Sequence, residues 1–145
     1  MIALASDHAG FDLKNKIASY LKELGLAYKD FGTFSDESCD YPQYALLAAN
    51  AVVSGECEKG VLVCGTGIGI SIAANKVKGI RCAACSEPFS AMLSKQHNDS
   101  NMLAFGSRVV GEGMARMIVK EWLDAVPMEG RHALRVEQIH AIENT

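Results

Sequence analysis

The sequence has no excess of positive charge and no long uninterrupted hydrophobic run. Its 14 Lys and Arg residues face 17 Asp and Glu residues, which gives a formal net charge of -3. This balance excludes a strong positive field that would attract nucleic acid or an anionic membrane, so any anion site has to be local. Glycine, serine or a charged residue interrupts each apolar stretch, which excludes the roughly 20-residue segment that spans a bilayer. We therefore expect neither nucleic acid nor a membrane as a partner.

The sequence also lacks the features of an exported protein. Residues 1–7 contain neither a basic start nor a long apolar stretch, so they do not resemble a secretory leader. The five cysteines cannot all pair with one another within one chain. We expect a reducing, cytoplasmic location.

The composition is that of one folded domain. Hydrophobic residues make up 49% and charged residues 21% of the 145 residues, and this length suits one core rather than two. Short apolar runs alternate with segments of helical period, which is typical of a parallel sheet with crossover helices. We predict a single domain, residues 1–145, of the α/β class. It should be a three-layer Rossmann-like sandwich with a five-stranded parallel sheet and a C-terminal helical tail.

The pattern also predicts where the elements lie. The predicted strands are 2–6, 27–31, 60–64, 80–85 and 101–105. The predicted helices are 11–24, 43–53, a short one ending near 75, one from about 88 to 96, 111–123 and 133–143. Gly25 is a plausible end of the first helix, and Ser86 is the predicted N-cap of the fourth.

Cys64 ends the third predicted strand, and a glycine-rich loop, Gly65-Thr66-Gly67-Ile68-Gly69, follows it. In an open parallel sheet, ligands bind at the edge where the strands end. Glycines there let backbone N–H groups converge into a cradle for an anion. The same groups favour the thiolate form of Cys64, which makes it a candidate base. A plain structural role stays open, in which Cys64 is a small core residue and the glycines allow close packing.

Three other interpretations of these residue types fit less well. A dinucleotide site would use Glu87 as a ribose ligand, but Ile70 stands where the third glycine of that fingerprint belongs. A cysteine phosphatase needs an arginine that closes the loop, and none occurs before Lys76. Cys82 and Cys85 have the spacing of a redox or zinc pair, but alternation along a strand sends their side chains to opposite faces. We predict no bound metal.

Two histidines and two arginines are further candidates. His8 follows the first strand and His97 lies in a predicted loop before the fifth, and imidazoles suit acid–base work near neutral pH. Either could instead be an ordinary surface or core histidine. Arg131 and Arg135 lie one helical turn apart. Basic residues at a helix start oppose its dipole; a bound phosphate would compensate, and a solvated basic face is the alternative.

Several motifs, in order along nearly the whole chain, resemble those of one enzyme family. They are Asp7-His8-Ala9-Gly10, Asp40-Tyr41-Pro42, residues 64–76 from Cys64 to Lys76, Gly79-Ile80-Arg81, Gln96-His97-Asn98-Asp99, Phe105-Gly106-Ser107-Arg108 and Gly130-Arg131-His132. The chain thereby resembles the type B ribose-5-phosphate isomerases, a family that includes allose- and galactose-6-phosphate isomerases.

The resemblance implies an aldose–ketose isomerase of the non-oxidative pentose phosphate pathway. It would interconvert ribose 5-phosphate and ribulose 5-phosphate through a cis-enediolate, without metal or organic cofactor. By motif position, Cys64 moves the proton between C1 and C2, Thr66 assists the loop in holding the enediolate, and His97 opens the sugar ring. The implied substrate-binding residues are Asp7, His8, Tyr41, Gly65, Gly67, Ile68, Gly69, Asn98, Arg108, Arg131 and Arg135.

The resemblance also implies a homodimer with shared active sites, sometimes paired into tetramers. Arg131 and Arg135 lie beyond the last predicted crossover and could reach a neighbour's cleft. Two alternative functions stay open. A six-carbon isomerase, such as one acting on allose 6-phosphate, needs only a slightly deeper pocket. A non-catalytic phosphate- or nucleotide-binding module would use the glycine-rich loop as a sensor.

Overall fold

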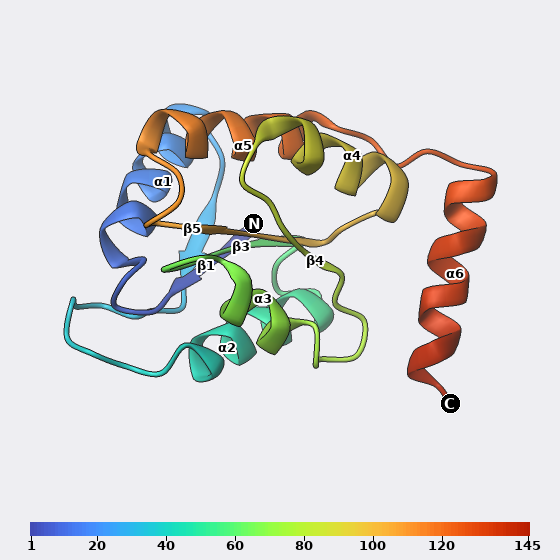
Figure 1. The fold of residues 1–145 in the computed structure, drawn as a ribbon, viewed down its shortest axis with the longest axis horizontal. Coiled ribbons are helices and arrows are strands. Elements are labelled where there is room, and N and C mark those ends of the chain that lie inside the picture. Colours follow the sequence, from blue (N-terminus) through green and yellow to red (C-terminus); the bar gives the residue numbers. More distant parts are fainter.

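Five parallel strands form the central sheet of the structure, a computed structural model that describes residues 1–145 (Figure 1). The strand order is β2-β1-β3-β5-β4, so that β3 is central and β2 and β4 are the edges. The strands are β1 (Ile2–Ser6), β2 (Tyr28–Asp30), β3 (Lys59–Cys64), β4 (Cys82–Ala84) and β5 (Met102–Gly106). This arrangement confirms the predicted α/β class and the five-stranded parallel sheet.

Helices cover both faces of the sheet. The helices are α1 (Phe11–Glu23), α2 (Tyr41–Val53), α3 (Ile68–Ala74), α4 (Pro88–Asn98), α5 (Glu112–Asp124) and α6 (Arg131–Glu143). Figure 1 shows α1, α4 and α5 on one face, and α2 and α3 on the other. The tail helix α6 stands to one side, beyond the β4 edge. No helix is both long and apolar enough to cross a membrane.

Two hydrophobic cores lie on the two faces, and alternation along each strand divides the side chains between them. In β3, Val61 and Val63 join the core under α1, α4 and α5, whereas Leu62 and Cys64 join the core under α2 and α3. The same rule separates Cys85 from Cys82, which lie against opposite cores as predicted. A redox or zinc pair is therefore not formed by these two cysteines.

Some element boundaries differ from the prediction. Strand β4 is three residues long rather than spanning 80–85, although Ile80 and Cys85 are both buried. Apolar composition reports burial, and it does not report strand pairing. The N-cap of α4 is Glu87 rather than Ser86, because its carboxylate accepts the Ser90 N–H at 3.0 Å. The same helix continues to Asn98.

The outer side of β4 is closed by a side-chain amide. Asn75, at the end of α3, accepts the Cys82 N–H through Oδ1 at 2.7 Å. Its Nδ2 donates to the Cys82 carbonyl at 2.9 Å. One asparagine thus satisfies both outward-facing backbone groups of the first residue of this edge strand.

A buried lysine fixes the segment that leads from β2 to α2. Lys14 on α1 is fully buried, and its Nζ donates to both carboxylate oxygens of Asp30, at 2.7 and 2.8 Å, and to the Thr33 carbonyl. Asp30 in turn accepts the Gly32 N–H at 2.8 Å. Because charges are rarely buried without partners, this cluster fixes the course of the chain toward Tyr41.

We predict that Lys14→Met lowers the free energy of unfolding by about 3 kcal/mol, because the change leaves Asp30 without its buried partner. Lys16→Met is the matched control, since Lys16 makes only an exposed pair with Asp12 and should change stability by less than about 0.5 kcal/mol. Urea unfolding of both variants measures the difference. Equal losses would show that the Lys14 charge does not hold this segment.

Candidate active site

The loop after β3 turns a backbone N–H toward a buried thiol. Cys64 is the last residue of β3 and is 4% exposed, and α3 begins four residues later at Ile68. The Gly67 N–H donates to Cys64 Sγ at 3.1 Å. The sulfur therefore faces the loop at the carboxyl end of β3. It lies at the rim of the core under α2 and α3, and an amide donor points at it.

Glycine is required at two loop positions by close contacts. Gly67 has a φ of +79°, and a Cβ there would lie 2.7 Å from backbone atoms of Phe105. A Cβ on Gly69 would lie 2.8 Å from the Tyr41 ring, so the phenol at the start of α2 packs directly against the loop. Tyr41 therefore lies against the loop that follows Cys64.

The turn after β1 contributes a carboxylate and an imidazole at the same edge. Asp7 is 7% exposed, and its Oδ1 accepts the Gly10 N–H at 3.0 Å. His8 Nδ1 accepts the Cys39 N–H at 3.2 Å. In the neutral ring, this bond leaves the proton on Nε2, which can donate to a ligand. Cys39 belongs to no functional motif in the sequence, and its backbone supports His8 from a loop 31 residues away.

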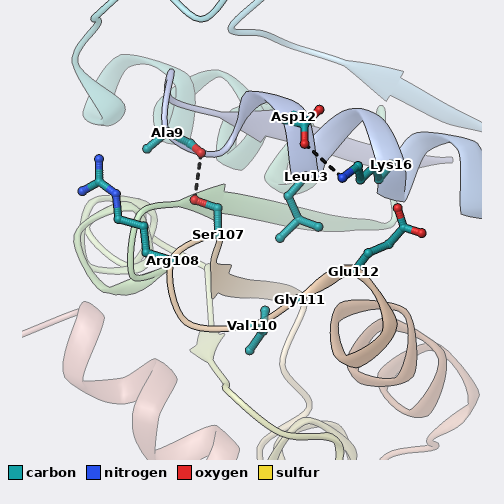
Figure 2. A pocket seen from close by; sticks show the side chains of 9 residues that line it. All are labelled: Ala9, Asp12, Leu13, Lys16, Ser107, Arg108, Val110, Gly111 and Glu112. Carbon is teal, nitrogen blue, oxygen red and sulfur yellow. Dashed lines mark hydrogen bonds and ion pairs between the residues drawn. The ribbon is translucent and has the colours of Figure 1, made fainter.

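Arg108 follows β5 and lies against the same loop. A Cβ on Gly65 would lie 3.2 Å from its Nη1. A hollow of about 390 Å³ opens behind it, between α1 and α5 (Figure 2). Figure 2 shows Arg108 and Glu112 on opposite sides of this hollow, with the Arg108 side chain pointing away from Glu112. Ser107 Oγ donates to the Ala9 carbonyl at 2.8 Å and ties the turn after β5 to the turn after β1.

A second group of predicted residues lies on the opposite side of the sheet, near the amino ends of the strands. His97 and Asn98 form the last turn of α4, which leads into the start of β5, whereas Cys64 lies where β3 ends. The predicted loop for His97 is wrong, because the residue lies in the last turn of α4. Arg131 and Arg135 are exposed on the first turns of α6.

His97 packs against the helix that carries the two arginines. Its ring stacks on His132 with centroids 4.2 Å apart. Burial lowers the pKa of His132, and the nearby His97, Arg131 and Arg135 charges lower it further. His132 therefore favours the neutral form, which suits a packing role between α4 and α6. A hollow of about 220 Å³ opens beside His97 between these helices.

Three other thiols, those of Cys57, Cys82 and Cys85, are poor candidates for proton transfer. Burial raises the pKa of Cys85 to about 11, and it raises the pKa of Cys82 and of Cys57 as well. Such thiols stay protonated near neutral pH. No group of three or more His, Cys, Asp or Glu side chains is arranged to hold a metal ion.

A thiol beside an amide donor, at the end of an α/β sheet where ligands bind, suits an enzyme that moves protons on a small polar ligand. The chain belongs to the ribose/galactose isomerase family, whose sequence model matches residues 2–139. It is therefore an isomerase.

Individual relatives are similar over the whole domain. The chain is 58% identical over 142 residues to ribose-5-phosphate isomerase B of Escherichia coli (strain K12), covering 98% of this chain and 95% of that protein. It matches the structure of Clostridium thermocellum ribose-5-phosphate isomerase B with a TM-score of 0.98 and 53% identity, covering 99% and 97% of the two chains. It also matches Mycoplasma genitalium ribose-5-phosphate isomerase B with bound ribulose-5-phosphate, with a TM-score of 0.94 and 38% identity, covering 99% and 95%.

We predict that Gly67→Ala destabilises the chain more than Gly55→Ala does. Both glycines have a left-handed φ, +79° and +86°, but only at Gly67 would a Cβ meet other atoms within 4 Å. The control should lose about 1 kcal/mol from backbone strain alone, and Gly67→Ala at least about twice that. Unfolding free energies in urea give the comparison. Equal values would mean that the contact with Phe105 relaxes without strain.

Proposed function

We propose that the chain interconverts ribose 5-phosphate and ribulose 5-phosphate through a cis-enediolate, without metal or organic cofactor. The observation that carries the proposal is the Gly67 N–H directed at Cys64 Sγ. An amide donor at 3.1 Å stabilises negative charge on sulfur, which a base needs. The named activity of the similar E. coli and C. thermocellum proteins supports the choice of sugar.

In this mechanism Cys64 takes the proton from C2 of the open-chain aldose and returns it to C1. The electrons of the broken C–H bond form the enediolate double bond, and the carbonyl oxygen O1 takes up the negative charge. When C1 is protonated, the proton of the C2 hydroxyl passes to O1, so that C2 becomes the ketone and C1 carries the hydroxyl. Backbone N–H groups of the loop from Gly65 to Gly69 stabilise that oxygen. Thr66 assists, because its Oγ1 accepts the Ile68 N–H at 3.1 Å and its own proton stays free to donate.

The other residues bind the sugar and open its ring. His97 moves a proton between the ring oxygen and the C1 hydroxyl, and Asn98 holds a sugar oxygen. Asp7, His8 and Tyr41 bind the substrate at the Cys64 edge. The phosphate is held by the exposed guanidinium groups of Arg108, Arg131 and Arg135, whose planar donors suit a dianion.

A second copy of the chain completes each site in this proposal. Cys64 lies where β3 ends and His97 lies before β5 starts, on opposite sides of the parallel sheet, so we infer that a single chain does not bring them to one substrate. In a homodimer, α4 and α6 of each chain would reach the thiol loop of the other, and such dimers could pair into tetramers. Exposed apolar residues beside the loop support a partner there, since Ile68 and Val109 are 56% and 57% exposed and line a hollow of about 280 Å³.

The proposed location is the cytoplasm, within the non-oxidative pentose phosphate pathway. All five cysteines are free, and three of them are buried. Free thiols in this number suit a reducing compartment.

Incubation with ribose 5-phosphate in D₂O tests the reaction directly. We expect ribulose 5-phosphate to form with deuterium at C1, observed by NMR. Cys64→Ser should lower kcat by about 10²- to 10⁴-fold, as expected for loss of a positioned base. Cys57→Ala is the control, because Cys57 is also buried but lies apart from the loop.

Two outcomes would redirect the proposal. A higher kcat/KM on allose 6-phosphate than on ribose 5-phosphate would identify a six-carbon isomerase. Ribose 5-phosphate binding without any isotope exchange, unaffected by Cys64→Ser, would identify a binding module.

Mixing two inactive variants tests the shared site. In a hybrid of Cys64→Ala and Arg135→Ala chains, one site contains both defects and the other contains none. Random exchange of equal amounts should therefore restore about one quarter of wild-type activity. Cys64→Ala mixed with His8→Ala is the control, since both residues belong to the same edge and no hybrid site is intact. No recovery in the first mixture, despite proven subunit exchange, would contradict site sharing.

A further inference from the structure

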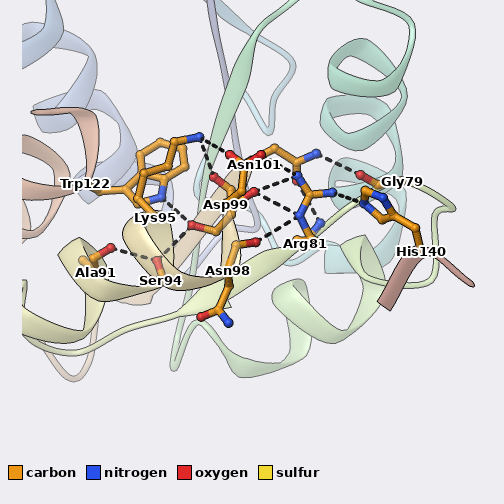
Figure 3. Close-up of polar contacts among 11 residues, drawn as sticks. Gly79, Arg81, Ala91, Ser94, Lys95, Asn98, Asp99, Asn101, Trp122 and His140 are labelled. Atoms are coloured by element: carbon orange, nitrogen blue, oxygen red, sulfur yellow. Dashed lines mark hydrogen bonds and ion pairs between the residues drawn. The ribbon is translucent and has the colours of Figure 1, made fainter. Parts of the chain in front are cut away.

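Arg81, just before β4, lies at the centre of a polar cluster that joins α4, α6 and the start of β5 (Figure 3). Its side chain is 14% exposed. The proposed mechanism gives it no role, although it stands in one of the motifs that carry the family resemblance.

The guanidinium holds the end of α4. Arg81 Nε donates to the carbonyls of Asn98 and Asp99 at 3.1 and 3.0 Å, and its Nη2 donates to the Asp99 carbonyl at 2.7 Å. These acceptors directly follow His97 in the chain. Figure 3 shows the Arg81 side chain reaching this turn from the segment that leads into β4.

The turn itself has a backbone that needs support. Asp99 has φ +44° and ψ +49°, the only left-handed residue in the chain that is not glycine. Lys95 Nζ donates to Asp99 Oδ1 at 3.0 Å and to the Ser100 carbonyl at 3.1 Å. Left-handed residues other than glycine persist where surrounding contacts fix them, and they cluster at functional sites.

The same guanidinium also contacts α6. Arg81 Nη1 and His140 Nε2 are 2.6 Å apart, and since a guanidinium has no acceptor, the imidazole nitrogen must accept. A second tie lies two residues earlier, where the Glu143 carboxylate accepts the Gly79 N–H at 3.0 and 3.1 Å. The helix that presents Arg131 and Arg135 is thus attached at its far end to the segment that holds the His97 turn.

Asn101 fixes this segment to the start of β5. Its Oδ1 accepts the Arg81 N–H at 2.8 Å, and its Nδ2 donates to the Gly79 carbonyl at 2.8 Å. The position of Arg81 is therefore set by the sheet, independently of the two helices that it joins.

We propose that Arg81 is a positioning residue that sets the geometry of His97 and Asn98 relative to the phosphate-binding arginines of α6. The inference rests on the proposed function and deepens it. Arg81 does not touch the substrate and acts through the backbone carbonyls of Asn98 and Asp99. Without it, the ring-opening group and the phosphate-binding group would reach the partner's thiol loop in variable relative positions.

The two sugars separate this role from a general effect on folding. Ribose 5-phosphate closes into a furanose through its C4 oxygen, so its isomerisation requires ring opening. Ribulose 5-phosphate cannot close in this way, because the C5 oxygen that would be needed carries the phosphate. Exchange of its C1 hydrogen with D₂O uses Cys64 and needs no ring opening.

We expect Arg81→Gln to lower kcat for ribose 5-phosphate isomerisation by about 100-fold, the effect of misplacing a reacting group by about 1 Å. The C1 exchange rate at saturating ribulose 5-phosphate should fall much less. The isomerisation kcat of Arg81→Lys should lie between those of the wild-type protein and Arg81→Gln, since an ammonium keeps the charge but loses the planar set of donors. Arg116→Gln is the matched control, because Arg116 pairs with Glu23 and Glu112 on the other side of the domain.

His140→Phe tests the contact with α6 separately and leaves the α4 carbonyls bound to Arg81. It should raise KM for ribose 5-phosphate through Arg131 and Arg135, with little change in kcat. It also keeps the proposal testable if Arg81→Gln does not fold.

Equal losses in isomerisation and exchange for Arg81→Gln would overturn the proposal, because an unstable fold affects both reactions alike. Unchanged kinetics in both Arg81→Gln and His140→Phe would overturn it as well. Absence of both reactions in the wild-type protein would instead disprove the proposed function, and with it this inference.

Discussion

In a parallel sheet, the carboxyl ends of all strands lie on one side and the amino ends lie on the opposite side. This constraint decides which residues of one chain can meet at one site. The turns after β1, β3 and β5 bring Asp7, Cys64 and Arg108 together, although they are distant in sequence. The same rule keeps His97 away from them, because it precedes a strand instead of following one. The chemistry of the proposed reaction is thus divided between the two ends of the strands, and the proposed homodimer would bring the two parts together.

Much of the fold could be predicted because hydrophobic periodicity reports burial directly. The α/β class, the strand number and the opposite directions of Cys82 and Cys85 all follow from that signal. It was less informative about boundaries, since Ile80 is buried without pairing in β4. The predicted loop at His97 is wrong because α4 continues two residues beyond Gln96, and hydrophobic periodicity does not fix where a helix ends.

Supporting contacts were beyond the reach of sequence reasoning because they join distant segments. The Lys14 ammonium meets Asp30 and Thr33 only after α1 has packed on the sheet, and the Cys39 N–H meets His8 across 31 positions. Nothing in the local pattern around Arg81 distinguishes it from a solvated surface arginine. The motifs indicated which segments matter, whereas the contacts explain how those segments are held in place.

Asn75 has a consequence for how copies of this chain can associate. By binding both free backbone groups of Cys82, it occupies the position that an added strand would need. The β4 border of the sheet is thereby protected from edge-to-edge aggregation, a common hazard of exposed strands. Oligomers built from this domain should accordingly not extend the sheet across the start of β4, and a neighbouring molecule on this border would be met by helices and side chains.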